Sequence, residues 1–144
     1  MATAPHEPLG KAILEPLKQR QQSRLMLMFA ACSGVIMVAL GAFAAHGLSH
    51  RLAPHLLDVF NVGVQYQAWH TLALLACGIL SRFLPSKALS YAALFFGLGI
   101  ICFSGSLYAL ALTSIKWFGP ITPMGGICFI IGWVMLAIAA WRSA

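Results

Sequence analysis

The sequence predicts an all-α integral membrane protein, a bundle of four transmembrane helices with a short interfacial helix between helices one and two. Of its 144 residues, 60% are hydrophobic and 8% are charged, and the mean hydropathy is +0.86, which is too apolar for a water-soluble domain. Charged residues are absent from four runs, each longer than the roughly 20 residues that a helix needs to cross a bilayer. These runs are residues 25–50, 59–81, 88–115 and 117–141. Strands are excluded because an open sheet edge cannot be satisfied in lipid.

Basic residues are distributed unevenly around these runs. Seven of the nine Lys and Arg residues lie before the first run, between the second and third, or after the fourth, whereas Arg51 and Lys116 lie in the other two loops. Because cytoplasmic loops carry the excess of Lys and Arg, both termini and the middle loop are predicted to be cytoplasmic. The formal net charge of +6 therefore indicates orientation and contact with anionic lipid, and the scattered basic residues do not favour nucleic-acid binding.

Residues 1–24 form a basic leader that is predicted to be cytoplasmic or interfacial. A secretory signal peptide is disfavoured, although residues 42–44 (AFA) resemble a cleavage site, because the apolar run exceeds the usual length of roughly 7 to 15 residues. The acidic residues of the leader disfavour a mitochondrial transit peptide. Residues 12–24 are instead expected to lie on the membrane surface, with apolar side chains in the interface. The basic side chains expected to contact lipid or a partner are Lys11, Lys18, Arg20 and Arg24.

Helix one is predicted over residues 25–46, and small side chains at helical spacing give it a face that another helix can approach closely. Residues 46–63 mix polar and apolar side chains and predict the amphipathic interfacial helix, in which Pro54 suits the first turn. Helix two is predicted over residues 62–82. The small face of helix one comprises Gly34, Val38, Gly41 and Ala45.

Helices three and four are predicted over residues 88–114 and 121–141, so that residues 25–142 make one transmembrane domain. Pro123 falls in the first turn of helix four, where its missing N–H costs little. Helices two to four each present a face of small, polar or aromatic residues. These faces comprise Tyr66, His70, Ala73 and Cys77 in helix two; Gly97, Ile101, Ser104 and Tyr108 in helix three; and Gly125, Phe129 and Gly132 in helix four.

Two histidines, His46 and His70, are predicted near the outer membrane boundary. An ionisable residue at such a depth is a candidate proton relay or metal ligand. The favoured interpretation is structural, with each imidazole joining two helices through a hydrogen bond, since no Asp, Glu, Lys or Arg lies in a predicted span. A metal bound by His46 and His50, which are four residues apart, and a haem between His46 and His70 are the alternatives.

The sequence contains no motif that predicts catalysis. The four cysteines fall one per predicted helix without a C-x-x-C pattern, which favours neither zinc nor disulfides. Residues 104–108 (SGSLY) include a serine that could act as a nucleophile, but no base or orienting acid accompanies it, so close helix packing is the favoured interpretation. We therefore expect neither enzymatic activity nor a cofactor.

Four phrases of the sequence match one family in order and spacing. They are GAFAAHGL (residues 41–48), GVQYQAWHTLALL (residues 63–75), FSGSLYALAL (residues 103–112) and GPITPMGG (residues 119–126). The chain resembles the YgdD/YwdK-type small integral membrane proteins, the family of domain of unknown function 423. The resemblance implies a four-helix, multi-pass protein of the bacterial inner membrane, with mitochondrial relatives. The chain departs from the family pattern at Ala44, where Gly is usual, at Trp69, where Tyr or Phe is usual, and in its long leader.

The predicted topology brings these four phrases together in the outer half of the bundle. There we expect a polar, glycine-rich cap that pins the helices through hydrogen bonds, each worth about 0.6 to 2 kcal/mol in a membrane. The polar positions are His46, Gln65, Tyr66, Gln67, His70, Ser104, Ser106, Tyr108 and Thr122. The close-packing or turn positions are Gly41, Gly47, Gly105, Pro120, Pro123, Gly125 and Gly126.

Two classes of function follow from this sequence. The favoured one is a non-enzymatic scaffold or accessory subunit, which docks on a larger membrane complex through its cap or its leader. The alternative is a homo-oligomeric channel or carrier for a small neutral or weakly basic solute, which would use the histidines and glutamines of the cap as its selectivity site. A metal or haem enzyme ranks third.

Overall fold

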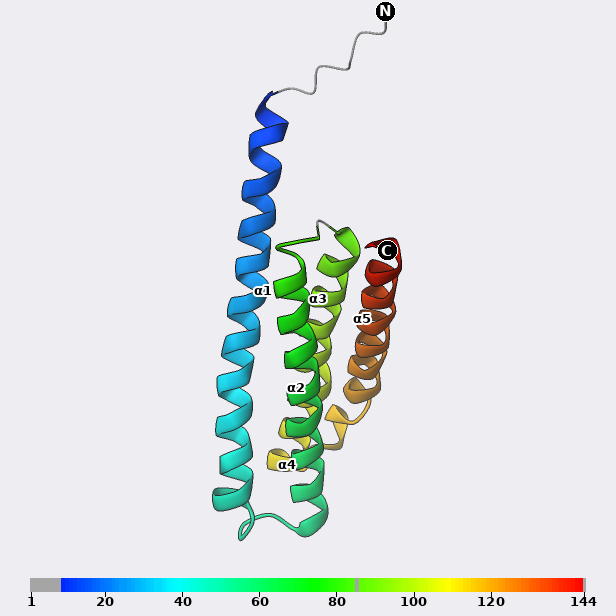
Figure 1. Ribbon diagram of the computed structural model, residues 1–144. Coiled ribbons are helices and arrows are strands. Elements are labelled where there is room, and N and C mark those ends of the chain that lie inside the picture. Colours follow the sequence, from blue (N-terminus) through cyan, green and yellow to red (C-terminus); the bar gives the residue numbers. More distant parts are fainter. Residues whose placement is uncertain (1–8, 85, 144) are drawn as a thin grey trace, which may run out of the picture.

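The computed structural model describes residues 9–84 and 86–143, and every regular element in these two ranges is helical (Figure 1). A short π-helical segment ends the first helical rod, a second one interrupts the rod formed by α3 and α4, and a 3-10 turn precedes the last helix. In chain order the elements are α1 (Leu9–Phe43), η1 (Ala44–Leu48), α2 (Pro54–Leu80), α3 (Lys87–Gly99), η2 (Ile100–Ser104), α4 (Gly105–Thr113), η3 (Lys116–Phe118) and α5 (Ile121–Ser143).

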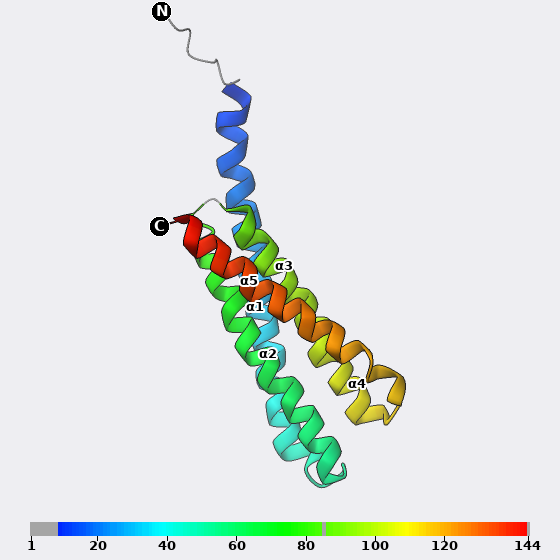
Figure 2. The same ribbon diagram turned by 90° about the vertical axis from the view of Figure 1, so that its right-hand side faces the viewer.

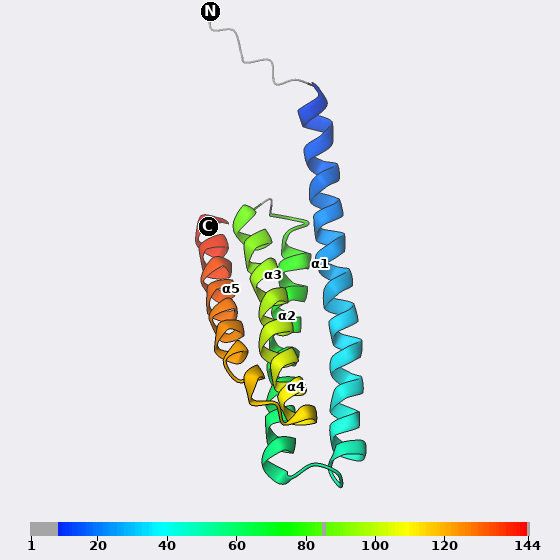
Figure 3. The same ribbon diagram turned by 180° about the vertical axis from the view of Figure 1, so that it is seen from behind.

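The helices run alongside one another, with the starts of α1 and α3 and the end of α5 at the same end of the bundle (Figure 1). Helix α1 packs along α2, α2 packs on α3, η2 and α4, and α3 packs on α5. Figure 2 shows α5 on the opposite side of the bundle from α1, and Figure 3 shows the same order from behind. Helix α2 is therefore the central helix, covered on both sides by protein.

Three stretches of the described chain are long and apolar enough to cross a membrane, namely residues 14–48, 87–113 and 116–142. Helix α2, predicted as a fourth span, does not reach this level of hydropathy because its middle contains Gln65, Gln67 and His70. The predicted separate interfacial helix is not confirmed, since Pro54–Leu80 is one continuous helix. The prediction that Pro54 suits a first helical turn is confirmed.

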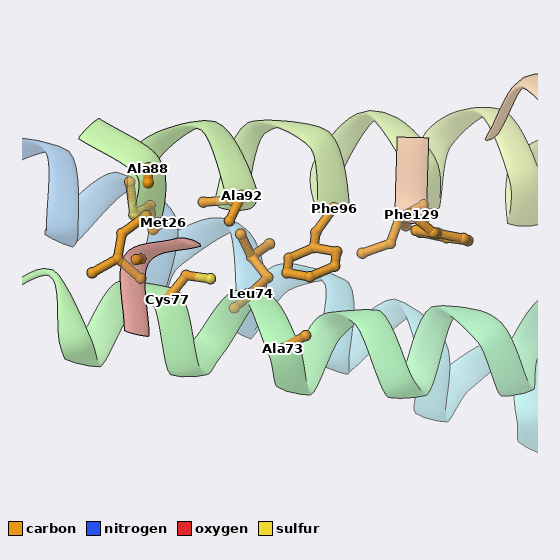
Figure 4. Close-up of a cluster of buried hydrophobic side chains, with 13 residues drawn as sticks. Met26, Ala73, Leu74, Cys77, Ala88, Ala92, Phe96 and Phe129 are labelled. Atoms are coloured by element: carbon orange, nitrogen blue, oxygen red, sulfur yellow. The ribbon is translucent and has the colours of Figure 1, made fainter. Parts of the chain in front are cut away.

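The buried core between the helices combines small side chains, mainly alanines, with a few aromatic and large aliphatic ones. Figure 4 shows its larger part, to which α1, α2, α3 and α5 all contribute. Its labelled members are Met26, Ala73, Leu74, Cys77, Ala88, Ala92, Phe96 and Phe129. Large apolar side chains point outward instead, for example Val35, Leu72 and Ile130, which are 72%, 64% and 65% exposed. This is the distribution of a protein whose outer solvent is lipid.

The face predicted for helix one is wrong except at Gly41, where a Cβ would lie 3.6 Å from Val64 of α2. Val38 is 66% exposed, and a Cβ added to Gly34 would meet nothing within 4 Å. Helix α1 packs mainly on α2, so only a narrow stripe of it is covered, and that stripe includes Ser23, Ala30 and Ser33. Helical spacing alone could not choose between two stripes of small residues. The predicted face of helix four is confirmed, since all three of its residues, Gly125, Phe129 and Gly132, are buried.

Helix α1 runs without a break through residue 24, where the sequence analysis placed the end of the leader. Among the described side chains of α1, Gln19 is the first that bonds to the rest of the bundle, and its Nε2 donates to the carbonyl of Ser81 at 2.7 Å. Residues 9–18 precede that bond, and we call them the overhang. At 1.5 Å per residue the overhang is about 15 Å long, and it projects beyond the ends of the other helices (Figure 1).

Candidate functional site: a polar network in the middle of the bundle

The polar residues of GVQYQAWH lie in the middle of α2, deeper than the outer position predicted for them. Helix α2 begins at Pro54 and ends at Leu80, so Gln67 lies thirteen residues from either end, or about 20 Å. The prediction started helix two near residue 62, which placed the polar band at the mouth of the helix. The observed band instead faces protein neighbours on α1, α4 and α5.

Gln67 is the centre of a hydrogen-bond network that joins three helices. Its amide Nε2 donates to the carbonyl oxygen of Ser33 at 3.0 Å and lies 3.2 Å from the Ser33 hydroxyl, both on α1. Its Oε1 accepts a 2.7 Å hydrogen bond from the Tyr108 hydroxyl on α4. The Ser33 hydroxyl is also bonded to that of Thr71, at 2.6 Å. We call Ser33, Gln67, Thr71 and Tyr108 the midplane network.

The space for the Tyr108 ring is created by Gly63. A Cβ at Gly63 would lie 2.7 Å from a ring carbon of Tyr108, closer than carbon atoms approach in packed proteins. Phe60, which is fully buried, packs against the same ring with a centroid separation of 4.7 Å. These contacts fix the ring so that its hydroxyl reaches Gln67.

His70 lies one turn further along α2, buried, with both ring nitrogens engaged. Its Nδ1 is 2.7 Å from the carbonyl oxygen of Tyr66, so Nδ1 carries the proton and donates it. Its Nε2 accepts a 3.3 Å hydrogen bond from the indole N–H of Trp133 on α5. Since an indole can only donate, Nε2 must be unprotonated in this arrangement. The geometry therefore specifies a neutral imidazole in a single tautomer.

An aromatic stack surrounds the imidazole. The ring of Phe129 lies face to face with His70, with centroids 3.4 Å apart and planes 6° apart. Tyr66 stacks on Phe103 at 4.6 Å. A side chain at Gly99 would overlap the ring of Phe129, so this glycine leaves the space in which Phe129 reaches His70. The imidazole is consequently held by contacts on its face and on its edge.

The other polar residues predicted for the cap differ in burial and in hydrogen bonding. Ser106 and Thr122 are bonded through their hydroxyls at 2.8 Å, and Ser106 donates a second bond to the Phe103 carbonyl at 2.9 Å. Ser104 is fully buried, yet its Oγ has no partner among the described residues. His46 and Gln65 are both exposed and lie outside the networks around Gln67 and His70.

The glycines and prolines predicted to pack closely or to form turns also differ in how much space surrounds them. Gly125 lies against the backbone of Phe103, where a Cβ would overlap it. A Cβ at Gly41 or Gly126 would make only ordinary contacts, at 3.6 and 3.9 Å, and one at Gly105 would meet nothing within 4 Å. A Cβ at Gly47 would lie 2.6 Å from the ring of Phe43, four residues earlier in the same helical rod. Pro120 and Pro123 are exposed at the start of α5.

Three members of these networks were missed by the sequence analysis. Ser33 and Thr71 carry a signal that could have revealed them, because each is a polar side chain in an otherwise apolar run. Trp133 carries none, since tryptophan is ordinary in a membrane helix and its role depends on the side of α5 that meets α2. The basic side chains of Lys18, Arg20 and Arg24 lie outside this site, in the N-terminal part of α1.

The arrangement uses its polar groups to bind other parts of the same chain. Gln67 employs both ends of its amide and His70 both of its nitrogens. In the part of the chain that the structure describes, no three His, Cys, Asp or Glu side chains are grouped so that they could hold a metal ion. The four cysteines are free thiols on different helices. The hydrogen bonds of this site therefore fix the helices relative to one another.

A bundle of long apolar helices with inward-facing, mutually bonded polar groups defines a multi-pass membrane protein. The model of the family described as "Protein of unknown function (DUF423)" matches residues 40–126, and the chain belongs to this family, which confirms the resemblance noted in its sequence. The chain is 45% identical over 121 residues to a UPF0382 membrane protein of Staphylococcus aureus, covering 84% of this chain and 98% of the relative. It is 42% identical over 120 residues to the UPF0382 inner membrane protein YgdD of Escherichia coli, covering 83% and 92%. No solved structure matches the chain.

Proposed function

We propose that the protein is a non-enzymatic inner-membrane protein whose closed helix bundle serves as a scaffold or accessory subunit of a larger membrane complex. The observation that carries this proposal is the pairing of the deepest polar groups with one another. Gln67 and His70, the side chains best suited to bind a solute or assist a reaction, are committed to Ser33, Tyr108, Tyr66 and Trp133. Such a site favours a fixed shape over turnover or passage.

In this proposal α2 is the fourth membrane span. Its 27 residues are about 40 Å long, enough to cross the roughly 30 Å hydrocarbon core. Its low hydropathy is no obstacle, because two of the three polar residues that lower it, Gln67 and His70, are buried against protein, and Gln65 is the exposed one. Trp117 and Trp141, each 85% exposed, lie near opposite ends of the last rod, as expected for aromatic anchors at the two interfaces.

The ends of the bundle support the predicted orientation. Arg82, Lys87 and Arg142 lie at the end from which the overhang projects (Figure 1). By the positive-inside bias this end faces the cytoplasm, so both termini are cytoplasmic. The overhang then extends α1 out of the bilayer on the cytoplasmic side.

The overhang is the surface on which we place the partner. Leu14 and Leu17 are 64% and 58% exposed, and their spacing of three residues puts them on the same side of the helix. A straight extension of a transmembrane helix carries these leucines beyond the lipid, where an apolar contact on another protein would cover them. Lys18 lies on the same segment, whereas Lys11, also predicted to contact lipid or a partner, lies outside the residues whose side chains the structure describes.

The channel or carrier is the second candidate, and one observation favours it. The Ser104 hydroxyl is buried and has no partner among the described residues. Ser104 is the last residue of the π-helical segment η2 (Ile100–Ser104), which interrupts a long helical rod, and such segments are frequent at functional sites. A water molecule or a solute would satisfy this group. Passage would still require the bonds of Gln67 to open and several copies to assemble.

The test is affinity purification of a chromosomally tagged protein in mild detergent, followed by mass spectrometry. The variant L14E/L17E places charges on the proposed contact surface, and Gln21→Glu, at another exposed position of α1, is the matched control. We expect a stoichiometric membrane partner with the wild type and Q21E, and its loss with L14E/L17E. Recovery of a monomer from all three strains contradicts the scaffold proposal, and a homo-oligomer that conducts solutes in liposomes favours the channel.

A further inference from the structure

A lateral groove lies between α1 and α3, toward the end of the bundle that carries the basic residues. Helix α1 packs along α2 and touches α3 only slightly, which leaves an open volume of about 300 Å³. This volume is at the lower end of the range for small-molecule sites. Its walls are almost entirely apolar and include Leu25, Met26, Phe29, Leu94, Leu98 and Ile101.

The groove continues into a second cavity of different chemistry. This cavity, of about 700 Å³, shares Gln22 and Ser90 with the groove, so the two volumes adjoin. Lys18 and Lys87 line it from two helices, α1 and α3, together with one carboxylate, that of Glu15. A third cavity, at the same end of the bundle, is lined by Arg20, Arg24 and Arg82. The mouth of the apolar groove is therefore surrounded by an excess of positive charge.

We propose that the protein binds one anionic phospholipid, with an acyl chain in the groove between α1 and α3 and the phosphate headgroup at Lys18 and Lys87. This inference rests on the way the groove and the second cavity adjoin. An apolar groove that leads into a cationic cavity matches the tail and the phosphate of a phospholipid. The level in the membrane also fits, since basic residues at the cytoplasmic surface attract anionic lipid.

A lipid fits this groove better than the helix of a second copy does. A helix with its side chains is about 10 to 12 Å across and is too wide to enter an open volume of about 300 Å³. That volume is enough for a flexible chain or for a few inserted side chains. The excess of cations over Glu15 favours an anionic headgroup over a zwitterionic one. A lipid bound here would occupy the space between α1 and α3, which touch each other only slightly.

The experiment is native mass spectrometry of the full-length protein, released from detergent after titration with phosphatidylglycerol or phosphatidylcholine. Two variants separate the headgroup from the tail. K18Q/K87Q removes the cations, with R51Q/K116Q at the opposite end of the bundle as its control. Gly97→Leu fills the groove, where a Cβ would meet Phe29 at an ordinary 3.6 Å, and Gly34→Leu, at a position with nothing within 4 Å, is its control. Circular dichroism and thermal melting verify that each variant folds.

We expect one tightly retained phosphatidylglycerol on the wild type and on both control variants. K18Q/K87Q should weaken retention of phosphatidylglycerol by about tenfold and leave phosphatidylcholine unchanged, whereas Gly97→Leu should weaken retention of both lipids. Equal retention of the two lipids by every variant would overturn the proposal, because it indicates unspecific annular lipid. A dimer of the wild type that Gly97→Leu dissociates, without bound lipid, would also overturn it and assign the groove to a second copy.

Discussion

The Tyr108 hydroxyl donates a 2.7 Å hydrogen bond to Oε1 of Gln67 and so joins α4 to α2 in the middle of the bundle. The amide nitrogen of the same glutamine reaches Ser33 on α1, so one side chain fixes three helices at a single level. Gln67 is buried between these helices, so a partner that is removed leaves a buried polar atom unpaired. The hydrogen bonds of these polar residues thus fix the helices relative to one another.

Gly63→Ala should destabilise the bundle by about 1 to 3 kcal/mol, because the added methyl group would lie 2.7 Å from the Tyr108 ring and would displace its hydroxyl from Gln67. The matched control is Gly34→Ala, whose methyl group meets nothing within 4 Å; it should be neutral or stabilise by up to about 1 kcal/mol. Unfolding in mixed micelles with increasing denaturing detergent measures both. Equal stability of the two variants would contradict the described packing.

His70 should be a neutral imidazole protonated at Nδ1. This follows from the Tyr66 carbonyl, which accepts from Nδ1, and from the Trp133 indole, which donates to Nε2. Nitrogen-15 NMR of protein labelled at histidine reports the two ring nitrogens separately, and the signal that disappears in His70→Asn assigns them. Trp133→Phe should shift the Nε2 resonance and leave Nδ1 protonated. A proton on Nε2 in the wild type would show that the bond to Trp133 does not form.

Two nearby serines should respond differently to removal of the hydroxyl. Ser106→Ala loses bonds to Phe103 and Thr122 and should cost about 1 kcal/mol of unfolding free energy. Ser104→Ala removes a buried hydroxyl that has no partner among the described residues, and it should be neutral or stabilising by up to about 1 kcal/mol. The same detergent titration compares them. A destabilised S104A protein would indicate that a bound water or solute satisfies that hydroxyl.

The proposed topology places Arg51 outside the cell and Lys87 in the cytoplasm. A membrane-impermeant maleimide applied to intact cells should therefore label Arg51→Cys, and should label Lys87→Cys only after the membrane is permeabilised. Wild-type protein, whose four cysteines lie within the long helices, controls for background labelling. If α2 does not span the membrane, the two introduced cysteines lie on the same side and should be labelled alike.

Much of the helical architecture could be predicted because it depends on composition and charge. The gaps between charged residues gave the long helices, and the Gly125, Phe129 and Gly132 face was visible in their spacing. The depth of Gln67 could not be predicted, because it depends on where α2 begins. The sequence around Pro54 suits either a separate interfacial helix or the first turn of one continuous helix, and only the second places Gln67 in the middle of its helix.

The candidate site was partly recognisable for a similar reason. Gln67, His70 and Tyr108 stand out as polar residues in apolar surroundings, and the structure brings each of them into a hydrogen bond. His46 stands out equally, yet it lies in η1, at the end of the first rod, and is exposed. Trp133 was not recognised because its partner is set by the way α5 meets α2. Which residues of different helices pair depends on how the helices pack, and this cannot be recognised in a single sequence.

A double-mutant cycle between Gln67 and Tyr108 measures whether the polar groups in the middle of the bundle hold its helices together. The unfolding free energies of the wild type, Gln67→Leu, Tyr108→Phe and the double variant are measured in mixed micelles, and Tyr91→Phe, at an exposed tyrosine, serves as control. Bonds from Gln67 to Ser33 cancel in the cycle. We expect a coupling of about 0.6 to 1.7 kcal/mol between the two residues. Effects that add to within about 0.3 kcal/mol would contradict it.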